Sequence, residues 1–109
     1  MAVISKANDV VTLINVFTVE PQHQQKLVDL LTEATEKVMR HLPGFVSANI
    51  HKSFDGTRVA NYAQWKSREH FEAMLKSPET LPHIGAVMQL AKFDAHLYEV
   101  SFVGEHSPE

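Results

Sequence analysis

The chain centres on the sequence SANIHKSFDGTRVANYAQW, residues 47–65, which predicts two β-strands joined by a tight turn. An Asp-Gly pair flanked by alternating apolar and polar residues is the strongest short-range signal for a hairpin. Asp55 and Gly56 therefore mark the turn. The pairing register of the two strands matters most, because a shift of one residue moves every side chain to the opposite face of the sheet.

Two registers are compatible with this turn. A two-residue loop places Ile50 beside Asn61 and points His51 to the other face of the sheet. A three-residue loop that ends at Gly56 instead gathers His51, Asn61 and Trp65 on one face, with Gly56 in a left-handed bulge. We favour the bulged loop, because aspartate tolerates the second turn position and glycine alone adopts a positive φ at low cost.

Length and composition limit the classes of protein that fit. A chain of 109 residues forms one domain with a modest core. The formal charge of −3 and the lack of a basic run argue against a nucleic-acid partner. Since no apolar run approaches membrane-spanning length and the first residues lack a signal-peptide pattern, we expect a cytoplasmic protein with no membrane partner.

The sequence gives no sign of a metal site. Cysteine is absent, which excludes disulfides, thiolate catalysis and metal ligation by cysteine. Seven histidines follow neither an HxH nor an HExxH pattern, and the four glycines form no phosphate-binding loop.

The chain divides into a flexible leader, one domain and a polar tail, which we place at residues 1–9, 10–104 and 105–109. Apolar periodicity within the domain predicts a strand, a helix, the hairpin, two helical segments and a last strand. These elements are expected at residues 10–19, 22–41, 45–65, 67–76, 80–91 and 95–103. Ser67 fits the N-cap of the first helical segment after the hairpin, and His70 stands where a capping box would have glutamate.

This order predicts an α+β fold of the ferredoxin-like, split βαββαβ type, with one four-stranded antiparallel sheet and helices on a single face. The first and last strands nevertheless carry apolar residues on both sides. A two-sided apolar sheet in so small a protein indicates that another chain covers the second face. We therefore predict a homodimer with sheets packed face to face.

Asn15 interrupts the otherwise apolar first strand. A buried carboxamide without hydrogen bonds costs roughly 1–3 kcal/mol. We therefore expect a group bonded to the Asn15 side chain.

Several motifs resemble one protein family. The sequence NYAQW on the third expected strand, the helix that begins KSREHF, and the segments PGFVSANIH and DGT are similar to the antibiotic biosynthesis monooxygenase domain, and especially to the small anthrone oxygenases of polyketide pathways. The resemblance covers residues 11–103. It implies a dimeric α+β barrel with a pocket between sheet and helices, which oxidises a small aromatic, polyketide-like or quinol substrate with O2 and without a cofactor.

The resemblance also assigns residues. Trp65 matches the family's tryptophan at the end of the third strand, Asn61 its asparagine, and His51 the histidine before the hairpin loop. Phe71 stands where the anthrone oxygenases have a tyrosine, and residues 78–91 lack the arginine that those enzymes place there.

Oxygenation without a cofactor requires an anionic form of the substrate, since triplet O2 reacts slowly with closed-shell molecules. Hydrogen-bond donors stabilise such an anion and a base generates it. Asn61 and the Trp65 indole supply donors. His51 supplies the base or orients the phenol, because histidine exchanges protons near neutral pH. We predict that the catalytic residues are His51, Asn61 and Trp65, and that the substrate-binding residues are Asn15, Phe71 and His83.

Two other functions remain open. A branch of the same superfamily degrades haem, with an asparagine on the first strand, a tryptophan ending the third strand and a helix histidine that ligates iron. Asn15, Trp65 and His83 occupy similar positions, and this alternative makes haem a cofactor. Because fold alone does not fix function, a small-molecule-binding dimer without catalysis is the third hypothesis.

Overall fold

The computed structural model describes residues 2–7 and 9–108, so Met1 and Asn8 of the expected leader and Glu109 of the expected tail lie outside the described residues. The elements follow the order β-α-β-β-α-α-β, and two short 3-10 segments flank the first helix within the single helix expected over residues 22–41. In chain order they are β1 (Val11–Val19), η1 (Pro21–His23), α1 (Gln24–Lys37), η2 (Met39–His41), β2 (Phe45–Lys52), β3 (Arg58–Trp65), α2 (Arg68–Lys76), α3 (Leu81–Met88) and β4 (Ala91–Tyr98).

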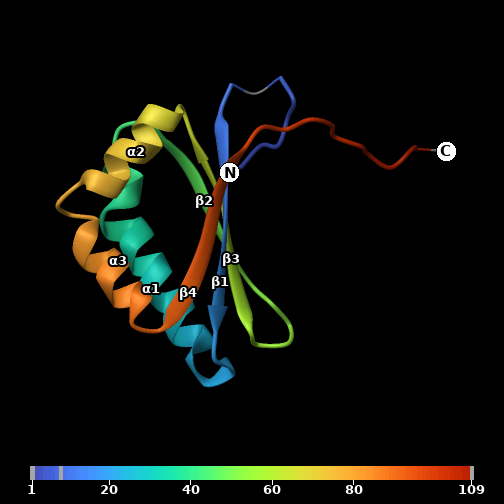
Figure 1. Cartoon of the computed structure of the whole chain (residues 1–109). Coiled ribbons are helices and arrows are strands. Elements are labelled where there is room, and N and C mark those ends of the chain that lie inside the picture. Colours follow the sequence, from blue (N-terminus) through green and yellow to red (C-terminus); the bar gives the residue numbers. More distant parts are fainter. Residues whose placement is uncertain (1, 8, 109) are drawn as a thin grey trace.

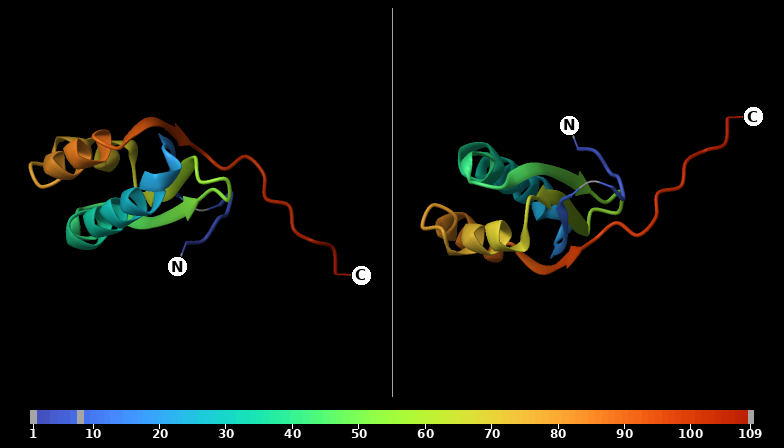
Figure 2. Two further views of the ribbon diagram at one scale, coloured as in Figure 1. Left: turned by 90° about the horizontal axis from the view of Figure 1, so that it is seen from below. Right: turned by 90° about the horizontal axis from the view of Figure 1, so that it is seen from above.

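The strands form one antiparallel sheet with the order β2-β3-β1-β4. The helices α1, α2 and α3 lie on one face of this sheet, and the chain after β4 extends away on the opposite side (Figures 1 and 2). The predicted ferredoxin-like α+β fold is thereby confirmed. No helix in the described part of the chain has both the length and the apolar character needed to cross a membrane.

The core lies between the sheet and the helices α1 and α3. Its buried side chains, each at most 6 % exposed, are Phe17, Val19, Leu27, Val59 and Val87. Burial of side chains of this size contributes roughly 1.5–3 kcal/mol each. This cluster holds the helical layer on the sheet, and Phe17 and Val87 also form a wall of the cavity described below.

The hairpin register differs from the favoured prediction. Ile50 pairs with Asn61, which turns His51 to the opposite face of the sheet. The bulged three-residue loop is therefore wrong, and the pairing is that of the other register. The loop itself is longer than either prediction, because the Ser53 backbone N–H donates to the Arg58 carbonyl at 3.0 Å and leaves residues 54–57 between them.

Side-chain hydrogen bonds within the loop explain this register. The Asp55 carboxylate accepts from the Ser53 hydroxyl at 2.7 Å and from the Thr57 backbone N–H and hydroxyl at 3.0 and 2.7 Å. The Ser53 hydroxyl oxygen accepts the Arg58 backbone N–H at 2.9 Å, and Gly56 adopts a φ of +82°. Because the Thr57 backbone N–H and the two hydroxyls all favour the charged carboxylate, the pKa of Asp55 falls from 3.8 to about 2.

The predicted start of α2 is confirmed. The Ser67 hydroxyl oxygen accepts the His70 backbone N–H at 3.1 Å and lies 2.7 Å from Nδ1 of the same residue. Histidine thus takes the position of glutamate in a capping box. Gly44 has a φ of +84°, and an added Cβ would overlap the His70 ring, so glycine lets the chain enter β2 close beside this cap.

The last strand starts and ends earlier than expected. β4 spans Ala91–Tyr98 instead of residues 95–103, so the turn expected after α3 is part of the sheet. Phe93 pairs with Phe17 of β1, and their ring centroids lie 6.2 Å apart. Polar residues alternate with Phe93 and Ala95, which is the pattern of an edge strand with one face toward the helices.

The face of the sheet opposite the helices is covered only in part. Near one end, Gln64 Nε2 donates to the Val3 carbonyl at 2.8 Å, and the Gln64 side chain is fully buried. The hydroxyls of Thr12 and Tyr62 on this face are buried and form no hydrogen bond with any described residue. We refer to this surface as the open face.

Candidate active site

A cavity of about 270 Å³ lies between the sheet and the helices α1, α2 and α3. This volume is near the lower end of the roughly 300–1,000 Å³ that is typical of small-molecule sites. Its lining is mostly aliphatic and aromatic, and every strand and α-helix contributes to it. A cavity of this kind suits a flat, largely apolar molecule.

Small residues on the sheet make room for the cavity. Ala63 of β3 pairs with Ala48 of β2 on one side and with Leu13 of β1 on the other, and Ala95 of β4 pairs with Asn15. All five residues line the cavity. No pattern within a single strand predicts this hollow, because each of the three alanines is the one small cavity-lining residue of its strand and they meet only through strand pairing.

Few polar side chains reach the cavity, and these are Asn15, Thr35, Asn61, His83 and the indole of Trp65. The Thr35 hydroxyl is already engaged, because it donates to the Leu31 carbonyl at 2.9 Å. The other side chains form no hydrogen bond with any described residue. They are therefore available to a ligand.

Asn15 and Asn61 lie side by side at the floor of the cavity. They are direct partners in the β1–β3 ladder, so their side chains rise from the same face of the sheet. Residues paired in this way have Cβ atoms about 4.5–5.5 Å apart. The two carboxamides thus form one polar patch on an apolar surface.

Neither carboxamide has its hydrogen bonds satisfied. The Oδ1 atoms of Asn15 and Asn61 are buried without a partner, and their Nδ2 groups donate to no described residue. No described residue supplies the group that is expected to bond to the Asn15 side chain. An unsatisfied buried polar group costs roughly 1–3 kcal/mol, and such groups are rare in native proteins. Two adjacent ones in a cavity indicate a ligand site.

Trp65 closes the cavity at the end of β3. It is 2 % exposed, and its ring makes edge contacts with Phe45 and Phe71, at centroid distances of 5.5 and 6.4 Å. These contacts fix the orientation of the indole. Its Nε1–H donates to no described residue, so it adds a third available donor to those of Asn15 and Asn61.

Phe71 and His83 belong to the helical side of the cavity. Phe71 lies in the first turns of α2 and His83 in the first turn of α3, and both are half-buried. The structure thus brings five of the predicted site residues to one cavity, and these are Asn15, Asn61, Trp65, Phe71 and His83. The three residues of the haem hypothesis are among them.

His51 is the exception, and its predicted place beside Asn61 and Trp65 is wrong. Its side chain is exposed on the open face, and its Nδ1 lies 3.0 Å from the Asn49 carbonyl oxygen. The physical reason is the four-residue hairpin loop, which pairs His51 with Ala60 and sends the imidazole away from the helices.

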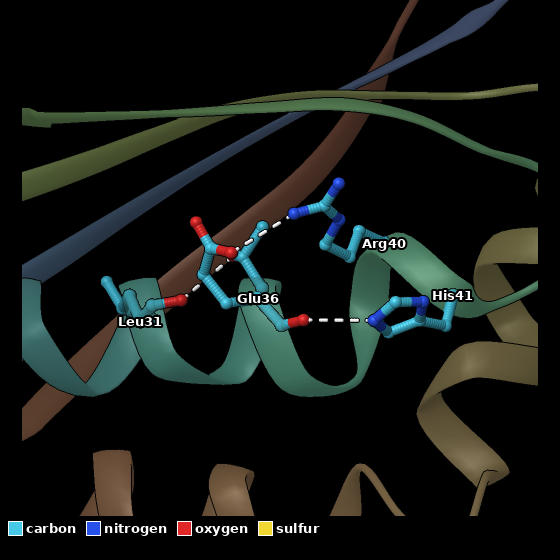
Figure 3. A network of polar contacts seen from close by, with 5 residues as sticks. Leu31, Glu36, Arg40 and His41 are labelled. Carbon is cyan, nitrogen blue, oxygen red and sulfur yellow. Dashed lines mark hydrogen bonds and ion pairs between the residues drawn. The ribbon is translucent and has the colours of Figure 1, made fainter.

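Polar contacts brace the cavity wall where α1 ends (Figure 3). The Arg40 guanidinium donates to the Glu36 carboxylate at 3.1 Å, and His41 Nε2 lies 3.1 Å from the Glu36 carbonyl oxygen. An exposed ion pair contributes only about 0–1 kcal/mol. Its effect is local, since it holds η2 against α1 and so positions Met39, which lines the cavity.

Comparison with known proteins finds relatives that are monooxygenases. A model described as antibiotic biosynthesis monooxygenase matches residues 10–85. Tetracenomycin-F1 monooxygenase of Streptomyces glaucescens is 44 % identical over 110 residues, which cover 100 % of this chain and 98 % of that protein.

Similar solved structures are also those of oxygenases. The ActVA-Orf6 monooxygenase of Streptomyces coelicolor, solved with the ligand nanaomycin D, has a TM-score of 0.80 and 31 % identity, over 89 % of this chain and 92 % of that one. SnoaB, a cofactor-independent oxygenase of Streptomyces nogalater, has a TM-score of 0.71 and 27 % identity, over 94 % of this chain and 100 % of that one.

Proposed function

Since the chain belongs to the antibiotic biosynthesis monooxygenase family, we propose that it oxidises one ring carbon of a polycyclic, phenolic polyketide with O2. The chain is a cofactor-independent monooxygenase, as its similarity to tetracenomycin-F1 monooxygenase and SnoaB indicates. The substrate class is supported by the name of tetracenomycin-F1 monooxygenase and by the nanaomycin D bound to ActVA-Orf6. A tetracenomycin-like aromatic polyketide is therefore the first substrate to test.

The observation that carries this proposal is the group of available donors in an otherwise apolar cavity. An aromatic ring system fits the aliphatic and aromatic walls, and a phenolic or ring-carbonyl oxygen accepts hydrogen bonds from Asn15, Asn61 and Trp65. Donors that are already in place stabilise negative charge on that oxygen strongly, because water is excluded. The substrate anion that forms in this way is electron-rich enough to react with O2.

The overall reaction converts a CH2 group and O2 into a carbonyl group and water. One oxygen atom of O2 enters the product, and the two hydrogens of the CH2 group leave with the other. In this scheme Asn61 and Trp65 stabilise the anion, Asn15 extends the same polar patch, and Phe71 packs against the ring system.

The homodimer predicted from the sequence is part of the proposal. Ile14 of the central strand β1 is half-buried on the open face. A second copy of the chain on this face would cover Ile14. Ile14→Lys is expected to give monomers in analytical ultracentrifugation, whereas dimers of the variant would contradict this arrangement.

O2 consumption tests the proposed function. Protein treated with a chelator is mixed with tetracenomycin F1 or 1,8-dihydroxyanthrone, and O2 uptake is followed together with isotope incorporation from labelled O2. We expect one labelled oxygen in the product carbonyl and uptake well above that of buffer. If no polycyclic phenol accelerates uptake, the proposal is wrong.

The haem hypothesis uses the same cavity, because Asn15, Trp65 and His83 all line it. Titration with haem distinguishes the two functions. A saturable Soret band that disappears in His83→Ala would favour haem binding, and oxidation of a phenol by haem-free protein would favour the oxygenase.

A further inference from the structure

We propose that His83 is the general base of the reaction, the group that takes the proton from the substrate hydroxyl and later returns it. This inference rests on the proposed function. It replaces the role that the sequence suggested for His51, whose side chain lies on the open face.

His83 is the only titratable side chain among the described residues that line the cavity. It is half-buried in the first turn of α3, and its ring forms no hydrogen bond or ion pair with any described residue. Both ring nitrogens are therefore available to a ligand. Histidine ordinarily changes charge between about pH 5 and 8, which is the range that a general base requires.

The fold places His83 and the carboxamides in different layers. Asn15 and Asn61 rise from the sheet, whereas α3 lies in the helical layer that covers the same face (Figure 1). Ile84 and Val87 of α3 also line the cavity, so this helix presents the side that carries His83 to the site. A flat substrate between the layers has amide donors on one side and the imidazole on the other.

Other histidines near the site are already engaged or lie outside it. His70 is bonded to Ser67 in the cap of α2, and His41 is exposed at the end of η2. His96 is paired with Asp94 at 2.7 Å on the exposed surface of β4. These contacts leave His83 as the histidine that a substrate in the cavity meets.

Charged residues on the elements packed around α3 do not compete for this role. All of them are exposed and none lines the cavity. They are Lys26, Asp29, Glu33, Glu36 and Lys37 on α1, Arg68, Glu69, Glu72 and Lys76 on α2, and Lys92 and Asp94 on β4. A proton taken from a substrate inside the cavity therefore goes to His83 or to water.

The proton and electron balance is complete with His83 and O2 alone. The CH2 group and the ring carbonyl first tautomerise to the enol, which has one C–H and one hydroxyl. The imidazole takes the proton of this hydroxyl, which gives an imidazolium and a phenolate whose charge is delocalised to the ring carbon that bears the remaining C–H. O2 accepts one electron from this anion, and the two radicals combine into a carbon–peroxide anion. The imidazolium then protonates the peroxide, and loss of the remaining C–H proton with cleavage of the O–O bond releases water and leaves the carbonyl.

An anaerobic titration tests the first step without turnover. 1,8-Dihydroxyanthrone is added to the protein in the absence of O2, and the phenolate absorbance of the bound probe is recorded. Binding is measured separately from quenching of Trp65, the single tryptophan of the chain. We expect a phenolate band in wild type near neutral pH, and its loss in His83→Gln with probe affinity changed by less than about threefold.

Turnover gives the second readout. General base catalysis typically contributes about 10²–10⁴-fold, so kcat of His83→Gln should fall by at least about 100-fold while KM changes little. If His83 is the base, the wild-type rate should fall at acidic pH, because a protonated imidazole cannot take a proton, and His83→Gln should lack this fall. His106→Gln is the matched control, because His106 is exposed after β4 and does not line the cavity, and it should keep both the rate and the pH profile.

A third variant guards against a folding defect. His83→Ala opens space for added imidazole, which should restore part of the phenolate band and of kcat. An unchanged band and pH profile in His83→Gln would overturn the proposal even if wild type oxidises the probe. A wild-type protein that forms no phenolate with saturating probe would overturn it as well, whereas failure of O2 uptake alone would count against the proposed function and not against the base.

Discussion

The hairpin loop and the cavity floor use polar side chains in opposite ways. In the loop, the Asp55 carboxylate accepts three hydrogen bonds from Ser53 and Thr57. On the floor, the carboxamides of Asn15 and Asn61 have no partner in the described part of the chain. The loop bonds contribute to folding, whereas the floor leaves hydrogen bonds unmade that only a ligand can complete. Substitutions in the two regions should therefore separate stability from activity.

The largest effect is expected from Asn61→Ala. Removal of a preorganised donor to a developing oxyanion typically lowers kcat by about 10²–10³-fold. Stability should not fall, because the Asn61 amide forms no hydrogen bond with any described residue. O2 uptake and thermal unfolding measure the two quantities on the same sample.

Asn49→Ala is the matched control for this variant. Asn49 lies on the same hairpin, but its Nδ2 donates to the Tyr62 carbonyl at 3.0 Å and to Ser47 Oγ at 3.3 Å. This variant should lose roughly 0.5–1.5 kcal/mol of unfolding free energy and keep its activity. The comparison fails if Asn61→Ala is the less stable of the two.

Trp65→Phe should show an intermediate effect. The substitution removes the indole N–H and keeps an aromatic ring between Phe45 and Phe71. We expect kcat to fall by about 10–100-fold and Tm to fall by a few degrees, since a smaller ring leaves space in a buried position. Stopped-flow O2 uptake and calorimetry measure these changes, and a variant with wild-type kcat would remove Trp65 from the donor group.

Ser53→Ala probes the hairpin loop, where the polar side chains are hydrogen-bonded. The Ser53 hydroxyl donates to Asp55 and accepts from the Arg58 backbone N–H. Its loss should lower the unfolding free energy by roughly 0.5–1.5 kcal/mol and leave kcat within about twofold, because the loop lies away from the cavity. Urea unfolding gives the first value, and a large loss of activity would show that the loop and the site are coupled.

The smallest effect is expected on Tm at acidic pH, where the Asp55 carboxylate becomes protonated. The folded-state pKa of Asp55 is depressed to about 2 from 3.8, so its contribution to stability is present above pH 3.8 and is lost as the pH falls toward 2. Asp55→Asn should flatten the decline of Tm over this interval. An identical decline in wild type and variant would show that other carboxyl groups account for it.

The sequence predicted much of this arrangement because its strongest signals are local. Asp55 and Gly56 located the hairpin, and Ser67 located the start of α2. The two residues Asn61 and Trp65 share a face in any register, since they are four positions apart on one strand. Their position in the cavity therefore did not depend on the loop.

Other features depended on contacts that no local pattern encodes. The side-chain bonds of Asp55 lengthened the loop and reversed the face of His51, and the pairing of Phe93 with Phe17 drew residues 91–94 into β4. The adjacency of Asn15 and Asn61 required the order of the strands in the sheet, which the sequence periodicity of each strand does not contain.

The most direct test of the account is a crystal structure of the protein with a polycyclic phenol or its quinone bound in the absence of O2. The account predicts a ligand oxygen within about 3.2 Å of Nδ2 of Asn61 or Asn15, or of Nε1 of Trp65, with its rings against Phe71. A ligand bound on the open face, or one whose oxygens avoid all three donors, would contradict the claim that these unmade hydrogen bonds form the active site.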